Sequence, residues 1–353
     1  MLSLAQRMLT TLQRRRPTNG AGARLQLAVA ATSLGEVRQA VAAGADWINY
    51  TQRSLCFDRR LRDSDAWTRE CREAIAIAHR GGRRIAVAFA ARYGTPELPR
   101  VARAAALLAE AGADALIASD LGTLDLIRNE CPGLALHVSP QASTTNREAV
   151  ALYAGEFGAT RVAIPTSLPA PRLRHLLAAS PVELELFAHG SYGAMLEGQC
   201  ALSSWITGAS VGRDGACSPA RVIREHRSGR TVISRLNGVL IDARPADVSA
   251  SLPAACRGRY RVGRGSAYLF GIHRPENLLE ALPTLESPKP IAFRVVPTAG
   301  GPERHRALLR AWREALDACI EDPARFAVRD EWRHALAHGG ELLPCSASTT
   351  GHR

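Results

Sequence analysis

Lysine is almost absent from this chain: of its 45 basic residues only Lys289 is a lysine, and the others are arginine. Aromatic residues make up 5% of the sequence, although the formal net charge is +12. Nucleic-acid-binding surfaces usually combine clustered basic residues with aromatics, whereas these arginines are spread over many predicted helices. So strong a preference for arginine is typical of a GC-rich coding bias. The composition therefore does not favour a nucleic acid as the partner.

Long apolar runs are missing as well. No uninterrupted run approaches the roughly 18 residues that would predict a membrane span. No apolar segment has the character of a secretory signal either. We therefore expect a cytoplasmic protein, in whose reducing surroundings the 8 cysteines serve metal or redox chemistry rather than disulfides.

Acidic residues are absent from the first 35 positions, where several leucines precede Arg14, Arg15 and Arg16. We expect residues 1–24 to form a basic, flexible N-terminal arm. A transit peptide or a membrane-surface helix is the alternative interpretation. In that case the arm would contact a membrane or a lipid carrier.

Several catalytic and metal-binding signatures are absent too. The H-E-x-x-H string of zinc proteases does not occur, and no cysteine and histidine occupy motifs typical of cysteine proteases. There is no C-x-x-C pair and no compact ferredoxin-like run of cysteines. Proteolysis is thus the least expected activity, and a metal site would have to combine cysteines that are far apart in the sequence.

What the chain does contain is a repeated unit: an amphipathic helix, a Gly-Ala turn and a short apolar strand. The turns lie at Gly44, Gly112 and Gly158, and glycine there supplies the left-handed residue that ends a helix. Further strands are predicted at 25–30, 84–90, 134–138, 182–188 and 291–296. Strands that alternate with helices indicate a parallel sheet, and the number of units predicts an α/β fold of the (β/α) TIM-barrel type.

The repeat also predicts how the chain is organised. Residues 25–322 are expected to form the barrel-like domain, and residues 323–353 a small C-terminal helical extension with a tail. The rhythm breaks in a cysteine- and glycine-rich insertion, the loop region 189–260, in which a strand pair is predicted at 231–242. Loops of this length are usually functional, and in barrels the loops that follow the strands carry the chemistry.

The cysteines fall into two groups. Cys71, Cys131 and Cys319 lie on predicted helices or at their ends and are expected to be core residues, while Cys345 lies in the tail. The other four lie in loops after predicted strands or in glycine-rich turns: Cys56, Cys200, Cys217 and Cys256. Four thiolates are the usual ligands of an iron–sulfur cluster. Their spacing alone leaves open whether they share a cluster or are ordinary buried side chains.

Several long motifs carry a resemblance to a known family. They are HVSPQASTTNREAV, from His137, then GACSPAR around Cys217, and RLNGVLID, from Arg235. The chain resembles the peptidase U32 family, and within it the proteins of O2-independent ubiquinone biosynthesis, the UbiU and UbiV type. The similarity extends from about Leu34 to Pro323.

The resemblance implies a [4Fe-4S] cluster held by four cysteines. Three of the four positions fall on Cys200, Cys217 and Cys256, but the remaining one is occupied by Gly193. The segment SLCFDRR, with Cys56 before paired arginines, resembles the first ligand loop of UbiV instead. We therefore expect Cys56 to replace the missing thiolate in a hybrid ligand set.

The resemblance also implies a reaction and a partner. It implies hydroxylation of a ubiquinone precursor without O2, with an organic oxygen donor, prephenate being the expected one. The protein would act as a heterodimer with a UbiV-like relative. Gln141, Asn146 and His189, in matched motifs at or near strand ends, are candidates to line the substrate cavity.

Two alternatives remain open at this point. Other members of the family hydroxylate RNA bases, rRNA included. The chain also lacks the family's Glu-Gly-Arg segment, which is replaced near Val296 to Thr298. This loss would suit a non-catalytic paralogue that binds a partner or a lipid.

Overall fold

The computed structural model describes residues 25–52, 55, 65–89, 91, 93–166, 168, 170–190, 195–196, 199–200, 223–246, 259–262, 264–268, 276–296 and 301–336. Eight parallel strands form a closed barrel. They are β1 (Leu25–Ala31), β2 (Trp47–Tyr50), β3 (Arg84–Phe89), β4 (Ala115–Ala118), β5 (Ala135–Val138), β6 (Ala159–Ala163), β7 (Glu183–Gly190) and β16 (Ile291–Val295). Each strand pairs with the next along the chain, and β16 pairs with both β7 and β1, which closes the ring. The predicted TIM-barrel-like fold is confirmed.

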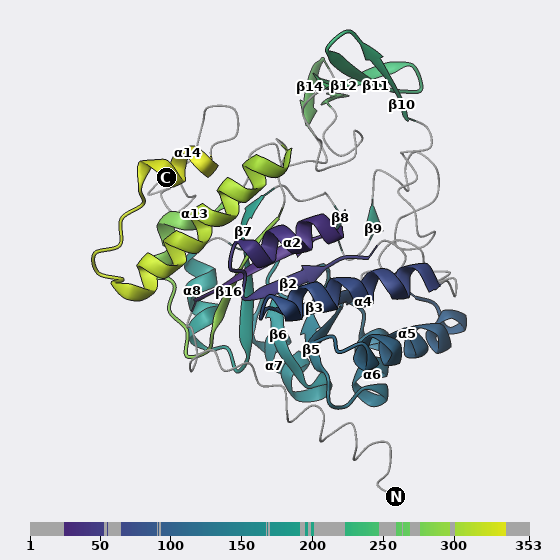
Figure 1. The fold of residues 1–353 in the computed structure, drawn as a ribbon, viewed down its shortest axis with the longest axis vertical. Coiled ribbons are helices and arrows are strands. Elements are labelled where there is room, and N and C mark those ends of the chain that lie inside the picture. The colour runs from purple at the N-terminus through teal and green to yellow at the C-terminus, as the bar shows by residue number, and fades with distance from the viewer. Residues whose placement is uncertain are drawn as a thin grey trace, which may run out of the picture.

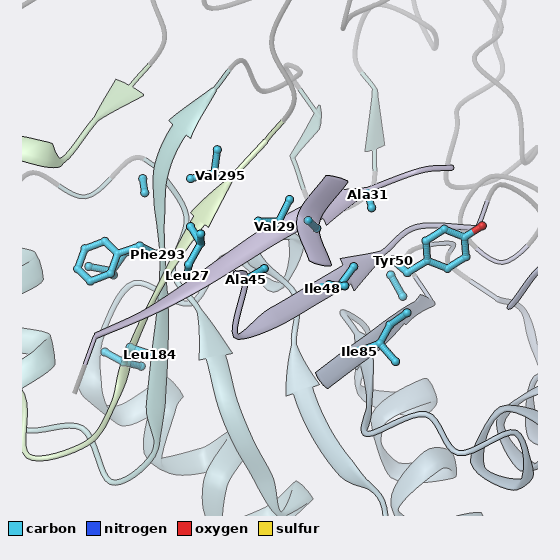
Figure 2. Packing of buried hydrophobic residues seen from close by; sticks show 14 of the residues in the cluster. Leu27, Val29, Ala31, Ala45, Ile48, Tyr50, Ile85, Leu184, Phe293 and Val295 are labelled. Carbon is cyan, nitrogen blue, oxygen red and sulfur yellow. The ribbon is translucent and has the colours of Figure 1, made fainter. Parts of the chain in front are cut away.

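Helices surround the barrel (Figure 1). They are α2 (Leu34–Ala42), α4 (Asp65–Arg80), α5 (Leu98–Glu110), α6 (Leu121–Glu130), α7 (Arg147–Phe157), α8 (Ala170–Ala178) and α13 (Gly301–Glu321), and the short 3-10 segments are η1 (Thr95–Glu97), η2 (Pro140–Ala142) and η3 (Leu279–Thr284). The main core lies between strands and helices, where the outward side chains of the strands are fully buried. Figure 2 shows Val29, Ile48 and Phe293 in this layer.

The Gly-Ala turns work as the sequence predicts. Gly44, Gly112 and Gly158 have φ values of +77°, +89° and +66°. In the first two repeats the aspartate that follows stabilises the neighbouring strand. The Asp46 carboxylate accepts a hydrogen bond of 2.8 Å from the Leu27 N–H, and the Asp114 carboxylate accepts one of 2.8 Å from the Ile85 N–H. These contacts lie at the amino ends of the strands, the face that in barrels serves stability.

A long insertion separates β7 from the last barrel strand. The chain leaves the barrel after Gly190 and returns in β15 (Glu276–Asn277), which pairs antiparallel with the end of β7. Within the insertion lie the short strands β8 (Met195–Leu196) and β9 (Gln199–Cys200) and the ribbon of β13 (Arg259–Val262) and β14 (Gly265–Tyr268). Both ends of the insertion are therefore at the carboxyl end of the barrel.

The insertion also contains a three-stranded antiparallel sheet, where the sequence predicted two strands. It consists of β10 (Ile223–Ser228), β11 (Thr231–Leu236) and β12 (Val239–Pro245). Asn237 and Gly238, both with positive φ, form the turn between β11 and β12, as expected for an Asn-Gly hairpin. Figure 1 shows this sheet standing apart from the barrel.

The C-terminal extension begins after α13. Helix α14 (Asp330–Leu336) packs against α13 through Trp332, whose indole N–H donates to the Glu314 carboxylate over 3.0 Å. Among the residues that the structure describes, no helix has the length and apolar character needed to cross a membrane.

A steric test of this architecture is available where the insertion leaves the barrel. Gly190 has a φ of +130°, and a Cβ atom there would lie 2.8 Å from the Val296 carbonyl oxygen. We expect Gly190→Ala to lower the free energy of unfolding by about 2–4 kcal/mol, through backbone strain and overlap together. Urea denaturation measures this change.

Gly158→Ala is the matched control, because Gly158 also has a positive φ but nothing lies within 4 Å of its added Cβ. It should cost only about 1 kcal/mol. Equal losses in the two variants would contradict the close approach of β7 to Val296.

Candidate functional site

The interior of the barrel is polar. Asn49 on β2 contacts Glu185 on β7, and Gln26 on β1 contacts Arg161 on β6. Neither pair of strands is adjacent in the sheet, so these contacts have to cross the space that the strands enclose. Barrel interiors are usually filled by branched apolar side chains. The buried polar groups here therefore indicate a specialised interior.

Glu185 is the centre of this interior network and is 3% exposed. The Asn49 amide donates to its two carboxylate oxygens over 3.0 and 2.9 Å. The Arg294 guanidinium donates to one of them over 2.8 Å, and Arg161 lies 3.8 Å from the other. A buried carboxylate is tolerated when cations and donors surround it in this way.

Arg161, 1% exposed, links Glu185 to the amino end of the barrel. Its Nε and Nη2 donate to the Glu183 carboxylate over 3.1 and 2.5 Å, and Nη2 also donates to the Gln26 amide oxygen over 2.7 Å. Glu183 keeps 27% of its side chain exposed, and Arg294 keeps 19%. The network thus runs along the barrel axis from Glu183 near one end to Arg294 near the other.

An aromatic ring forms one wall of the network. Trp47 on β2 lies between two guanidinium groups, with the Cζ atoms of Arg84 and Arg161 at 4.3 and 4.5 Å from the ring centroid. The His137 ring meets Trp47 edge-on at 4.8 Å. Cation–π attraction of this kind is strongest where water is excluded, so Trp47 helps to hold two cations close together.

His137 is uncharged in this setting. Burial lowers its pKa well below the ordinary value of 6.5, and the Arg161 and Arg84 guanidinium groups lower it further. The same burial lowers the pKa of Arg84. The interior therefore disfavours any further cation.

Small side chains make room for these large ones. A cluster of buried residues inside the barrel contains Ala28, Trp47, Ala86, Ala115 and Ala292. Among the described residues of this interior, four buried atoms have no hydrogen-bond partner: Asn49 Oδ1, His137 Nδ1, Trp47 Nε1 and Arg161 Nη1. Buried polar atoms are almost always paired, so these are positions at which water or a polar ligand group would bind.

The carboxyl end of β2 is anchored directly before the predicted Cys56 ligand. Leu55 is fully buried, its N–H donates to the Gln52 carbonyl, and its carbonyl accepts a 2.5 Å hydrogen bond from the Tyr93 hydroxyl. The Glu70 carboxylate accepts hydrogen bonds from Tyr50 and Gln52 over 2.5 and 3.1 Å. Burial and the Glu70 carboxylate raise the pKa of Tyr50, so its hydroxyl stays protonated and donates.

The predicted cluster ligands lie mostly outside the described residues. Cys56, Cys217 and Cys256 are not among them, and Cys200 is placed only as the last residue of strand β9. Within the described part of the chain, no three histidine, cysteine or acidic side chains gather as a metal site. In chain order, Cys56 follows β2 and the other three cysteines follow β7. All four therefore come after the carboxyl ends of barrel strands.

The cysteines predicted to be core residues are confirmed as such. Cys71, Cys131 and Cys319 are buried and form no disulfide. Burial raises the pKa of Cys131 and of Cys319, and a protonated thiol is a poor metal ligand.

The three predicted cavity residues have different surroundings. His189, near the end of β7, is 1% exposed, and its carbonyl accepts the Val296 N–H over 2.9 Å. Gln141 is half-buried in η2, after β5. Asn146 is exposed and its side chain caps α7, accepting the Ala149 N–H over 2.8 Å. All three follow or end barrel strands, and a role in a substrate cavity stays a prediction.

Sequence reasoning missed the interior network. It treated the strands as continuous apolar runs, but charged residues interrupt three of them, in ATRVA, ELELFAHG and IAFRV. Glu183, Glu185 and His189 alternate with apolar residues along β7, which is the period of a strand with one polar face. That alternation was the signal available for Glu185.

Comparison with known proteins gives the family. The sequence profile of Peptidase family U32 matches residues 32–341, which is most of the chain. The chain belongs to this family. The resemblance seen in the sequence motifs is therefore confirmed at the level of the family.

Three curated relatives illustrate the similarity. The 23S rRNA 5-hydroxycytidine C2501 synthase of Escherichia coli is 30% identical over 197 residues, covering 56% of this chain and 29% of that protein. The tRNA hydroxylation protein P of E. coli is 29% identical over 191 residues, 54% of this chain and 41% of that protein. The tRNA hydroxylation protein P2 of Bacillus subtilis is 30% identical over 168 residues, which cover 47% of this chain and 52% of that protein. The chain thus spans about half or less of the length of these relatives.

The Glu185 network can be tested by removing its central charge. We expect Glu185→Gln to lower the free energy of unfolding by about 3–5 kcal/mol, because two guanidinium groups would lose their buried counter-charge. Denaturant unfolding followed by circular dichroism measures the change.

Glu73→Gln serves as the control, since Glu73 and its partner Arg38 are both exposed and solvent can replace their interaction. A Glu185→Gln variant as stable as the Glu73→Gln variant would show that Glu185 is not the centre of the network.

The lowered pKa of His137 predicts that the stability of the fold depends on pH. Its pKa in the folded protein is lowered below 6.5, so the unfolded chain binds the proton more readily. Stability should be unaffected by His137 above about pH 6.5 and should fall by up to about 1.4 kcal/mol per pH unit between about pH 6.5 and 5. His305, whose pKa is also lowered by burial, acts in the same direction.

The measurement is the free energy of unfolding across this pH range, in wild type and in His137→Gln. The variant should show a shallower loss as the pH falls. Identical slopes would mean that His137 is protonated in the folded barrel.

Proposed function

We propose that this protein is a component of an O2-independent hydroxylation system whose substrate is an RNA base. One observation carries the proposal: the chain belongs to the U32 family, and curated relatives from two bacterial species are named for hydroxylation of rRNA or tRNA. Composition alone disfavoured a nucleic acid, because the arginines are spread over the whole sequence. The names of the relatives favour RNA as the substrate instead.

The proposed cofactor is a [4Fe-4S] cluster held by Cys56, Cys200, Cys217 and Cys256. A set of four thiolates is what such a cluster requires, and the other cysteines that the structure describes are buried in the core. When bound, the cluster would supply the accessible redox levels that amino-acid side chains lack. Leu55, the residue directly before Cys56, is held by the Tyr93 hydroxyl.

The interior network has a supporting role in this proposal. Arg294 lies near the carboxyl end of β16, beside the buried Glu185, and is the partly exposed cation of the network. An anionic organic oxygen donor that enters from the carboxyl end would meet this guanidinium. Asn49 and Glu185 hold Arg294 in place, so the cation is positioned before any ligand arrives.

A second candidate substrate is a ubiquinone precursor, modified in a heterodimer with a UbiV-like relative. The observation that favours it is the SLCFDRR loop, which places Cys56 before Arg59 and Arg60 in the UbiV manner. The two candidates share the cluster and the type of reaction and differ in the molecule that is hydroxylated.

The cluster assignment is tested by anaerobic reconstitution with iron and sulfide. We expect Cys56→Ala to lose most of the bound iron and of the broad visible absorbance, because one of four ligands is removed. Cys71→Ala is the matched control: it removes a thiol that is fully buried in the core and should leave the iron content unchanged. Equal iron in wild type and Cys56→Ala would overturn the hybrid ligand set.

The substrate is tested in a strain that lacks this protein. We expect mass spectrometry of total RNA nucleosides to show the loss of a hydroxylated base, while the pool of quinone precursors under anaerobic growth stays unchanged. Complementation with wild type, but not with Cys56→Ala, should restore the base. Accumulation of a quinone precursor with unchanged RNA would instead support the second candidate.

A further inference from the structure

The sheet of β10, β11 and β12 concentrates positive charge in a small part of the chain. Residues 223–246 contain five arginines and two acidic residues. The arginines are Arg224, Arg227, Arg230, Arg235 and Arg244. Four of these five are exposed, and Arg244 is half-buried.

Two of these arginines lie directly opposite each other. Arg224 on β10 is paired in register with Arg235 on β11, so both side chains are on one face of the sheet. Like charges in this cross-strand position repel and destabilise a sheet. His226, two residues along β10, is on the same face, about 7 Å further along the strand. The repulsion between Arg224 and Arg235 is relieved when an anion lies across this face.

Arginines elsewhere are matched by acidic residues. On α13, Arg313 contacts both Asp46 and Asp317, at 2.9 and 2.7 Å, and on α2 Arg38 contacts Glu73 at 3.1 Å. Within the described part of the chain, Arg224, Arg230 and Arg235 form no ion pair with an acid. The Arg235 guanidinium donates to the Gly238 carbonyl within its own hairpin over 3.1 Å.

The sheet is also poorly supplied with a core of its own. Ser234 and Ile241 are its buried residues, and Val239 and Leu240, at the turn between β11 and β12, are 66% and 53% exposed. Folding alone does not explain a small projecting sheet with basic strands and exposed apolar residues at one end. Such a surface fits a partner that offers many negative charges together with apolar edges.

We propose that the face of β10–β12 that carries Arg224 and Arg235, together with Arg230 in the turn between β10 and β11, is a docking surface for RNA. This inference rests on the proposed function and deepens it, because it places substrate capture on the insertion, outside the barrel. Phosphates supply the repeated negative charge, and the exposed Val239 and Leu240 contact sugar or base edges.

The test measures RNA affinity against salt concentration. The holoprotein is titrated with unmodified transcribed tRNA between about 50 and 200 mM salt. The variant Arg224→Gln, Arg230→Gln, Arg235→Gln should bind on the order of 10-fold or more weakly, and the slope of log affinity against log salt should fall by about 2 if three phosphate contacts are lost.

The matched control removes the same charge from barrel helices: Arg172→Gln, Arg174→Gln and Arg310→Gln, all exposed. It should retain wild-type affinity and slope. Ultraviolet crosslinking of wild type to the same tRNA provides a second measurement that needs no variant, and the crosslinked peptides should come from residues 223–246.

Three outcomes would overturn the docking surface: equal weakening in the two variants, crosslinks confined to the barrel, or tight binding to vesicles containing phosphatidylglycerol with no binding to tRNA. Its failure is distinguishable from failure of the proposed function. If the deletion strain has normal RNA but the triple variant binds tRNA weakly, the substrate proposal falls and the docking surface stands. If the variant binds tRNA normally while the strain lacks a hydroxylated base, the docking surface falls and the substrate proposal stands.

Discussion

The buried carboxylate of Glu185 is the group on which the interior of the barrel depends. Its contacts come from β2, β6 and β16, three strands that are separated along the chain. An isolated buried charge would cost several kcal/mol, whereas a charge with two guanidinium groups and an amide around it is tolerated. These contacts require the ring of strands to be closed, because Asn49 reaches Glu185 only across the interior. The polar cluster and the barrel geometry therefore depend on each other.

This interior has a consequence for chemistry at the carboxyl end. The same network that balances Glu185 fixes Arg294 near the exits of β7 and β16, and the long insertion leaves from the end of β7 and returns beside it in β15. Leu55, anchored by Tyr93, fixes the exit of β2. A site formed by the loops there would stand on a rigid, water-poor floor, and such preorganisation is what holds reacting groups in place. The first proposed ligand, Cys56, thus directly follows a residue that is fixed by a hydrogen bond.

Much of the fold could be predicted from sequence because its signals are local. Glycine at 44, 112 and 158 ends helices through backbone geometry that one residue determines, and the strands were found within one or two residues of their observed ends. The interior network is not local: Asn49 and Glu185 are 136 positions apart, and no short pattern shows that two strands face each other across a barrel. Charged residues within β6, β7 and β16 did indicate a polar face. The resemblance to the family made the cysteines the leading candidates for a site. The charged residues in these strands were therefore not considered.

The arginines show why an average over the sequence is a weak guide to function. The composition argument treated them as evenly spread and discounted the net charge of +12. Their electrostatic meaning depends on what stands next to each one. Arg161 and Arg294 neutralise buried carboxylates, and Arg313 binds Asp46 at the amino end of the barrel, so these cations contribute little to the field outside the protein. Arg224 faces another arginine on an exposed sheet, and its charge is directed into solvent. Association with a polyanion is governed by such unmatched charge on one face and not by the total, which is why a modest sheet outside the barrel can determine the partner of the whole molecule.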